Sequence, residues 1–304
     1  MSLERQFYAI APTQFTLAGG LDAGATSENV ERATEMGVSR FLLTGAYGEF
    51  QSLEDHERVS LVEAVKLRCP QVVVMAGAVH PSTDATLHLA RRLFESGADE
   101  VMVGPPSMSE IVESDVLRHF AHLDAHADGS LVVYNNVVFG TDLSPGVVSV
   151  IADMPSYGAI KQGTSSIARM LDTVAAARHG SNGMRVLAAS DITALATLAA
   201  GVDGMSSTNF WAFPEAFLTI ARTAATADHE IAEQTYSALA PFLGLARAIG
   251  QPRAIKSVMT NRGFAGTSAV RLPYEVLSAD ENHQLETAVE AADAALATIG
   301  ASSL

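Results

Sequence analysis

Short runs of apolar and β-branched residues alternate along the chain with longer segments of helical periodicity. Successive runs are about thirty residues apart, which is the length of one strand and one helix in a repeating unit. Eight runs follow this pattern, at residues 7–11, 40–43, 71–76, 100–103, 130–134, 158–161, 185–188 and 204–207. The pattern therefore predicts eight consecutive strand–helix units.

The segments between the runs carry the signals of helix starts. Thr26 opens one apolar face, Ser82 precedes another, and Ser144 with Pro145 precedes a third. Serine caps helix N-termini, and proline is well accepted at the first helical position. The runs themselves do not alternate between apolar and polar positions, which is typical of parallel strands buried on both faces.

Eight such units without a break in composition predict an α/β fold, a closed (β/α)8 TIM barrel. The alternative is a doubly wound open sheet, but no GxGxxG motif follows the first run, which disfavours a dinucleotide-binding version. Later segments are purely helical, at residues 214–226, 229–250, 252–260 and 279–299. We therefore expect a catalytic barrel over residues 1–225 and a C-terminal helical extension over residues 226–304, packed on the barrel.

Composition and charge narrow the classes of partner. The 304 residues are 48% apolar and 17% charged, and the net charge is −15. An acidic chain of this kind is not expected to bind nucleic acid or an anionic membrane surface, because both require basic faces. The single cysteine, Cys69, forms no disulfide within one chain, and no apolar run reaches the length of a transmembrane helix. The first residues lack the apolar core of a signal peptide, so the expected location is cytoplasmic.

One lysine lies where a buried strand is predicted. The chain has three lysines, and Lys66 and Lys256 fall in amphipathic helical patterns, where an exposed lysine is ordinary. Lys161 instead ends the apolar run at residues 158–161. Burial disfavours the charged ammonium and leaves a neutral amine that attacks carbonyl carbons to form a Schiff base. The alternative is a strand-end lysine whose head reaches water.

The ends of the predicted strands carry further candidate chemistry, because a barrel of this kind has its active site there. Tyr134 ends the run before that of Lys161, and neighbouring strands lie about 4.8 Å apart. The phenol and the amine are therefore expected to meet, and a phenol can act as general acid and base. The second run is followed by a loop with two glycines, called the 45–49 loop below. Its backbone amides could bind a carboxylate, and the alternative is a plain tight turn.

Four motifs occur in a specific order along the chain. They are Gly45-Ala46-Tyr47-Gly48-Glu49, Tyr134-Asn135, Gly158-Ala159-Ile160-Lys161, and Gly204-Met205-Ser206-Ser207 followed by Pro214. In this order and spacing they resemble the motifs of the dihydrodipicolinate synthase and N-acetylneuraminate lyase family of class I aldolases. The resemblance runs over almost the whole chain, from Pro12 to Pro273.

The resemblance implies a mechanism for the matching positions. Lys161 would form an imine with a small-molecule 2-oxo acid such as pyruvate, and Tyr134 would relay protons. The amides of Ala46 and Tyr47 would hold the carboxylate of the substrate, in a binding set that also contains Gly45 and Ser206. The protonated imine is the electron sink, so no cofactor or metal is implied. The family usually assembles as a homo-oligomer, a dimer of dimers.

Several positions depart from the family pattern. Ala46 and Tyr47 replace two loop hydroxyls, and Phe139 stands where synthases of this type carry an arginine. Met108 lies in a segment that has lost an aromatic residue, and Trp211 replaces a frequent asparagine. With Asp191, the residues Phe139, Met108 and Trp211 form a candidate second-substrate pocket, which predicts a less charged second substrate. True dihydrodipicolinate synthase activity is therefore not expected.

Three functions remain open from the sequence. The first is an aldolase or lyase that makes or breaks a C–C bond. The second is a dehydratase of a deoxy-oxo sugar acid by the same imine chemistry, and the third is a non-catalytic ligand-binding barrel. Tyr47 either replaces the relay hydroxyl or points away as packing, whereas Glu49 is expected to brace the loop. A histidine trio on one helix is interpreted as an outer face and not as a metal site, at His119, His122 and His126.

Overall fold

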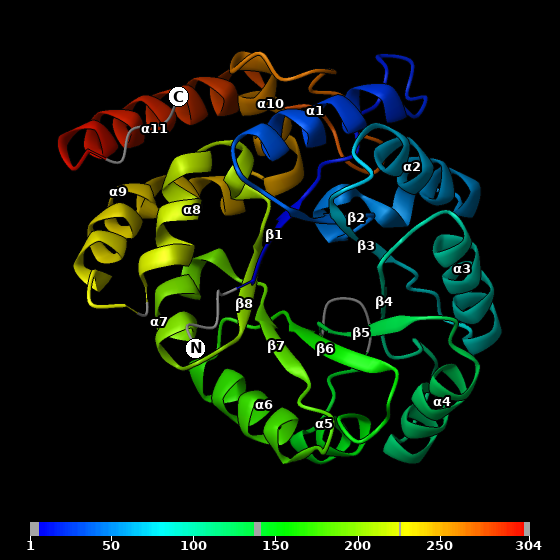
Figure 1. The fold of residues 1–304 in the computed structure, drawn as a ribbon. Coiled ribbons are helices and arrows are strands. Elements are labelled where there is room, and N and C mark those ends of the chain that lie inside the picture. The colour runs from blue at the N-terminus through cyan, green and yellow to red at the C-terminus, as the bar shows by residue number, and fades with distance from the viewer. Residues whose placement is uncertain (1–5, 137–140, 225, 301–304) are drawn as a thin grey trace.

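The computed structural model describes residues 6–136, 141–224 and 226–300. Its centre is a closed barrel in which each parallel strand pairs with the next along the chain and β8 pairs with β1 (Figure 1). The strands are β1 (Gln6–Ile10), β2 (Arg40–Leu43), β3 (Val73–Gly77), β4 (Glu100–Val103), β5 (Ser130–Asn135), β6 (Tyr157–Gln162), β7 (Arg185–Ala188) and β8 (Gly204–Ser207). The predicted (β/α)8 TIM barrel is confirmed, and the open-sheet alternative is wrong.

Strands β2, β4, β7 and β8 have the predicted bounds, and the other four differ by one or two residues at one or both ends. Strand β6 begins at Tyr157, which pairs with Leu131 beyond a register shift. The Tyr157 hydroxyl donates a hydrogen bond of 3.0 Å to the Phe120 carbonyl. The register of β5 and β6 places Tyr134 opposite Lys161, so the two predicted reactive side chains come from paired positions.

Eight helices of the barrel follow the strands around its outside (Figure 1). They are α1 (Ala23–Glu35), α2 (Asp55–Arg68), α3 (Thr83–Glu95), α4 (Glu113–His126), α5 (Pro145–Ile151), α6 (Ile167–His179), α7 (Ala194–Ala199) and α8 (Pro214–Thr223). Ser82 caps α3 and Ser144 caps α5, as the sequence predicts. Helix α1 begins before the expected Thr26, because the Asp22 side chain caps it by accepting a hydrogen bond from the Ala25 amide at 2.8 Å.

Two apolar layers explain why the strand runs do not alternate. An inner cluster fills the barrel and is built from Tyr8, Ile10, Leu42, Met75, Met102, Val132, Tyr134, Ala159 and Leu187. A larger outer cluster lies between the strands and the helices and contains Phe41 and Leu43, the neighbours of Leu42. Successive strand residues thus enter one layer or the other, and both layers require apolar side chains.

The C-terminal extension consists of α9 (His229–Ala248), α10 (Gln251–Asn261) and α11 (Ala279–Thr298). Helix α9 packs against α8 and α11 (Figure 1). Contacts with turns that follow the strands connect the extension to the barrel, including those of α10 with the 3₁₀ turn η5 (Asn209–Trp211) after β8. Helix α10 reaches the 3₁₀ turn η1 (Ala46–Gly48) after β2, and α9 reaches the 3₁₀ turn η4 (Asp191–Thr193) after β7. The extension therefore borders the loops in which the site is predicted.

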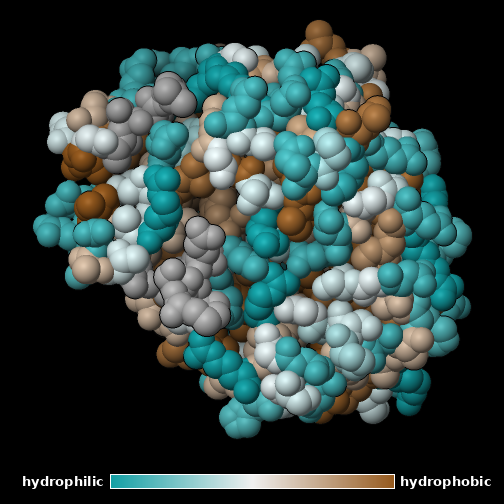
Figure 2. Space-filling model, viewed as in Figure 1, coloured by the Kyte–Doolittle hydropathy of each residue, from teal (hydrophilic) through white to brown (hydrophobic). Residues whose placement is uncertain are grey.

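The surface agrees with the acidic composition. In the view of Figure 2 the exposed residues are mostly hydrophilic or intermediate, and hydrophobic residues are scattered between them. Most of the buried apolar residues therefore belong to the two core layers. A surface of this kind is ordinary for a folded protein.

Candidate active site

Lys161 and Tyr134 lie side by side inside the barrel. The Lys161 Nζ atom is 4.4 Å from the centroid of the Tyr134 ring. Both side chains are buried, with exposed fractions of 3% and 2%. The structure therefore brings together the two residues that the sequence singled out, and it does so inside the apolar inner cluster and not at a solvated strand end.

The surroundings of Lys161 favour its neutral form. Burial lowers the pKa of the Lys161 amine to about 7, and the nearby Asp191 carboxylate opposes this shift. A large share of the amine is then neutral at neutral pH, and the neutral amine is the nucleophile. Burial raises the pKa of the Tyr134 phenol, while a hydrogen bond of 3.0 Å donated by the Asn136 amide to its oxygen acts in the opposite direction. The phenol therefore keeps its proton at neutral pH.

Asp191 is the charged residue that raises the pKa of Lys161. It follows β7 and accepts hydrogen bonds at its Oδ2 atom from the Ser207 hydroxyl at 2.9 Å and the Asn209 amide at 2.6 Å. Burial raises the pKa of the Asp191 carboxyl to about 6, against these hydrogen bonds and the charge of Lys161. No described residue donates a hydrogen bond to its Oδ1 atom, although that atom is also buried. The carboxyl therefore has one oxygen left for a substrate or a proton.

The 45–49 loop is a short 3₁₀ turn that ends in an unusual backbone conformation. The Gly48 amide donates to the Gly45 carbonyl at 3.0 Å, and the Glu49 amide donates to the Ala46 carbonyl at 3.1 Å. Within the described chain no carbonyl accepts a hydrogen bond from the amide of Ala46 or Tyr47. Gly45 packs closely, since a Cβ atom there would lie 3.2 Å from the Leu42 side chain. The loop thus presents two adjacent free donors.

The Tyr47 side chain is directed into the barrel. Its half-buried ring packs against the inner cluster that contains Tyr134. Burial raises the pKa of the Tyr47 phenol, the Asp191 carboxylate adds to the increase, and the guanidinium of Arg247 on α9 opposes it. The Tyr47 phenol also contributes to the raised pKa of Tyr134. The ring therefore does not point away from the barrel, and the interpretation that its hydroxyl replaces the missing relay group stays a prediction.

Glu49 braces the loop, as the sequence predicted, but its partner was not foreseen. The Lys256 amine of α10 donates a hydrogen bond of 2.5 Å to Glu49 Oε1, and neither side chain is exposed. The expectation that Lys256 is an ordinary exposed helix lysine is wrong. Its apolar neighbours Ala254 and Ile255 are buried with it, and they were the only local signal for this position.

Two of the residues expected in the second-substrate pocket, Trp211 and Met108, lie elsewhere in the structure. Trp211 is fully buried in the outer cluster, where its indole Nε1 donates a hydrogen bond of 2.7 Å to the Ile10 carbonyl and its ring packs on Phe264. Its assignment to a substrate pocket is therefore corrected to the core. Met108 is 65% exposed and lies in a separate pocket beside α3 and α4. Phe139 lies outside the described residues.

Ser206 is buried at the end of β8, and its hydroxyl donates a hydrogen bond of 3.5 Å to the Ala188 carbonyl. Its neighbour Ser207 was not predicted as a site residue, but Ser207 holds Asp191. Asn136 was also missed, although it contacts the Tyr134 oxygen. Both stand next to motif residues in the sequence, and only the strand register decides which neighbour faces the barrel interior.

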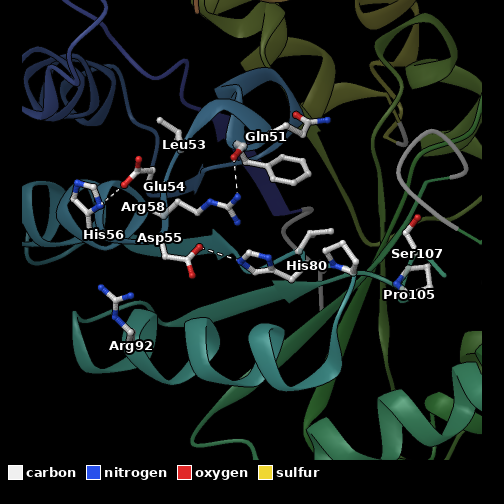
Figure 3. A pocket seen from close by; sticks show the side chains of 13 residues that line it. Gln51, Leu53, Glu54, Asp55, His56, Arg58, His80, Arg92, Pro105 and Ser107 are labelled. Carbon is white, nitrogen blue, oxygen red and sulfur yellow. Dashed lines mark hydrogen bonds and ion pairs between the residues drawn. The ribbon is translucent and has the colours of Figure 1, made fainter. Parts of the chain in front are cut away.

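A pocket lies beside this cluster, and Lys161 is not among the residues that line it. It has a volume of about 790 Å³ and is formed by the loops after β2, β3 and β4. Figure 3 shows His80 facing Asp55 there, at 2.9 Å, with Arg58 above them. Val79 lines this pocket and also packs against the inner cluster, so the pocket and the lysine site share one wall.

Among the described residues, no group of three or more His, Cys, Asp or Glu side chains is arranged to hold a metal ion. His119 is buried and not on an outer face, because its ring contacts the Thr83 hydroxyl and the Gly104 carbonyl. None of the described helices combines the length and the apolar character needed to cross a membrane.

Comparison with known proteins identifies relatives over nearly the whole chain. The model of the dihydrodipicolinate synthetase family matches residues 4–292. A 4-hydroxy-tetrahydrodipicolinate synthase of Stenotrophomonas maltophilia (strain K279a) is 29% identical over 285 residues, which cover 93% of this chain and 94% of the relative. An uncharacterised DapA-like lyase of Thermococcus kodakarensis is 26% identical over 268 residues, covering 86% of this chain and 90% of that one.

Solved structures share the fold. YagE of Escherichia coli K12, a prophage protein of the dihydrodipicolinic acid synthase family solved in complex with pyruvate, has a TM-score of 0.88 at 22% identity. The match covers 95% of this chain and 98% of YagE. A monomeric dihydrodipicolinate synthase variant has a TM-score of 0.89 at 23% identity, covering 95% and 97% of the two chains.

Proposed function

The chain belongs to the dihydrodipicolinate synthetase family of lyases, and from that premise we propose that it forms a Schiff base between Lys161 and a 2-oxo acid and then makes or breaks a C–C bond. The observation that carries this proposal is a buried lysine beside a buried tyrosine, with the pKa of the lysine lowered to about 7. The complex of YagE with pyruvate is consistent with a 2-oxo acid of that size.

The proposed reaction begins at Lys161 Nζ. The neutral amine attacks the C2 keto carbon, protons pass from nitrogen to the former keto oxygen, and water leaves to give an imine. Tyr134 relays these protons, and Asn136 orients its hydroxyl. In the cleavage direction the C3–C4 bond breaks, its electron pair enters the protonated imine to give an enamine, and the C4 hydroxyl loses a proton as the aldehyde departs. The imine nitrogen is the electron sink, so this chemistry needs no metal or organic cofactor.

The carboxylate of the 2-oxo acid is proposed to bind the free amides of Ala46 and Tyr47. Backbone amides on a fixed loop bind an anion without a cationic side chain. The inward Tyr47 phenol takes the place of the missing loop hydroxyl, because it lies within electrostatic reach of both Tyr134 and Asp191. Ser206 completes the binding set at the end of β8.

The second substrate is proposed to differ from that of the synthases named above. The expectation of a less charged second substrate depended in part on Trp211 and Met108, which lie elsewhere. The groups that act electrostatically on Tyr47 include the Asp191 carboxylate and the exposed Arg247 guanidinium, and such polar groups favour a hydroxylated partner. The replaced loop hydroxyls at Ala46 and Tyr47 support the proposal that this chain is not a true dihydrodipicolinate synthase.

Dehydration of a deoxy-oxo sugar acid is a second candidate, and Asp191 is the observation that favours it. In that reaction the C3 proton is removed from the imine and the C4 hydroxyl leaves as water after it is protonated. A buried carboxyl with a pKa of about 6 and one unpaired oxygen is suited to give that proton. A non-catalytic barrel is less well supported, because the lowered pKa of Lys161 occurs beside a tyrosine ring and without the bonded carboxylate that Lys256 has, and such perturbed groups cluster at functional sites.

Borohydride trapping tests the proposal. Incubation with pyruvate and borohydride is expected to leave a reduced adduct on Lys161, located by peptide mass spectrometry, and the Lys161→Met variant should carry none. Trapping with 3-deoxy-2-oxo sugar acids, followed by product analysis, separates the two reactions, since aldol cleavage releases pyruvate and dehydration does not. Absence of any adduct across pyruvate and the sugar acids would favour the non-catalytic barrel. Light scattering would test the proposed dimer of dimers.

A further inference from the structure

The 45–49 loop lies between two residues with left-handed backbone conformations. Thr44 has a φ of 50° and Glu49 a φ of 56°, and neither is a glycine. Such conformations persist only where the surroundings hold them. Thr44 is held by the neighbouring strand, because the Gly77 amide of β3 donates a hydrogen bond of 2.8 Å to its side-chain oxygen. At the other end of the loop the Thr13 hydroxyl donates to the Gly48 carbonyl at 2.7 Å, and the Glu49 side chain is held by the C-terminal extension.

Three hydrogen bonds fix Glu49 and its partner. Lys256 of α10 donates to Glu49 Oε1 at 2.5 Å, and the backbone amide of Arg271 donates to Oε2 at 3.1 Å. Lys256 also donates to the Ala269 carbonyl at 2.9 Å, and its ammonium lies 4.2 Å from the centroid of the Phe15 ring. Among the described residues, each hydrogen-bond donor to the Glu49 carboxylate therefore comes from the extension.

The pair is poorly explained as a source of stability. Both side chains are fully buried, and two charges taken out of water carry a desolvation penalty that their attraction often only offsets. A pair of apolar residues would fill the same space as well. A buried pair does, however, require one geometry, because moving either group leaves the other charge unpaired. It therefore constrains the loop conformation more strictly than apolar contacts would.

We propose that Lys256 is a positioning residue for the carboxylate-binding amides of the 45–49 loop. Through Glu49 it holds the end of the loop in the left-handed conformation that turns the Ala46 and Tyr47 amides toward the substrate. The extension thereby contributes to the site without touching the substrate. This inference rests on the proposed function, because it assigns a supporting residue to the carboxylate site proposed above.

The test compares two substrates that differ only in the carboxylate. Pyruvate and methyl pyruvate have the same keto carbon, but only pyruvate carries a charge for the amides to bind. Wild-type protein is expected to reach half-maximal borohydride trapping at a much lower concentration of pyruvate than of the ester. The Glu49→Gln/Lys256→Met double variant leaves no unpaired charge in the core. It should raise the half-maximal concentration about tenfold or more for pyruvate while that for the ester stays the same, because small displacements of positioned groups have large effects.

Arg253→Met is the matched control. Arg253 also lies on α10 and pairs with Glu281 of α11 at 2.8 Å, away from the loop. This variant removes an ion pair of the extension and should leave the ratio of the two half-maximal concentrations unchanged. Circular dichroism establishes that each variant is folded, and Glu49→Gln alone provides a second variant if the double variant does not fold.

The outcomes separate the two proposals. A folded double variant that loses preference for pyruvate supports the positioning role. If the folded double variant keeps the ratio of the half-maximal concentrations for ester and pyruvate, the positioning role is overturned and the Schiff-base chemistry remains intact. If the wild-type protein traps neither compound, the proposed function fails, and the positioning role fails with it.

Discussion

At the scale of single residues, burial alone does not identify a reactive lysine. Lys161 and Lys256 are both buried, and burial lowers the pKa of each amine. Lys256 contacts the Glu49 carboxylate, which holds its charge in place. Lys161 instead lies against the Tyr134 ring, and the Asp191 carboxylate acts on its pKa through charge alone. The partner, more than the depth, distinguishes a structural lysine from one that can act as a nucleophile.

The pH dependence of imine formation follows from this environment. Trapping should increase as the pH rises through about 7, because the neutral amine is the nucleophile. Asp191 raises the pKa of Lys161 against burial, so Asp191→Asn should move the midpoint to lower pH. Initial trapping rates measured as a function of pH check this. Asp153→Asn, which alters a surface carboxylate bonded to Ser181, should leave the midpoint in place, and an unchanged midpoint in Asp191→Asn would contradict the assigned coupling.

Lys161 should also destabilise the folded state. Its pKa falls from 10.5 to about 7 on folding, so the unfolded chain binds more protons between these values. The stability therefore rises with pH across that interval, and the full penalty applies below about pH 7. Lys161→Met should raise the free energy of unfolding near neutral pH by about 2–5 kcal/mol, since one pKa unit corresponds to about 1.4 kcal/mol. Urea unfolding measures this, and a gain that persists at high pH would indicate a packing effect instead.

At the scale of elements, the order of the strands assembles the site. Strands β6, β7 and β8 are neighbours, so Lys161, Asp191 and Ser207 meet at their ends although they are far apart in sequence. Asp142, which follows β5 in the sequence, is also held at a strand end. The side-chain amide of Asn135 donates to Gln162 of β6 at 2.9 Å and to Asp142 at 3.2 Å. The strands therefore carry Lys161 and Tyr134 at their ends, and the segments that follow the strands add further site residues such as Asp191.

The turn after β8 contains Trp211, which was expected in a substrate pocket but lies in the outer core. Trp211 fills the outer core and donates a hydrogen bond to Ile10. Trp211→Phe should lower the free energy of unfolding by about 2–4 kcal/mol, through a lost hydrogen bond and a small cavity. The half-maximal substrate concentration should stay the same. Met108→Ala, at an exposed position, should change stability by less than about 0.5 kcal/mol. A changed substrate preference in Trp211→Phe would return Trp211 to the pocket.

At the scale of the whole molecule, the extension and the barrel depend on each other. Phe242 of α9 packs edge-on against Phe213 at 4.8 Å, and both are buried. Lys256 connects α10 to the 45–49 loop. Removing the extension would expose the apolar face of α8 and take away the partners of Glu49.

A truncated chain of residues 1–225 is therefore expected to aggregate or to lack a cooperative unfolding transition. Large exposed apolar patches promote association between molecules. Size-exclusion chromatography and circular dichroism measure this outcome. A monomeric, cooperatively folded fragment that traps pyruvate at Lys161 would show that the barrel is independent of the extension.

The sequence alone determined the barrel and the reactive pair. Periodicity and run length are local properties, and they placed four strands to the residue. Because consecutive strands of a barrel are neighbours, knowing that Tyr134 and Lys161 end successive strands was enough to predict that they meet.

Only the tertiary structure decided the supporting residues. Glu49 and Lys256 lie 207 positions apart, and no local pattern relates them. The same holds for Trp211 and its acceptor Ile10, which belong to the first and last strand regions of the closed barrel. The direction of Tyr47 also depends on what surrounds its loop. Local sequence sets which element a residue joins, but burial and partners depend on packing between distant segments, which hydrophobic periodicity does not encode.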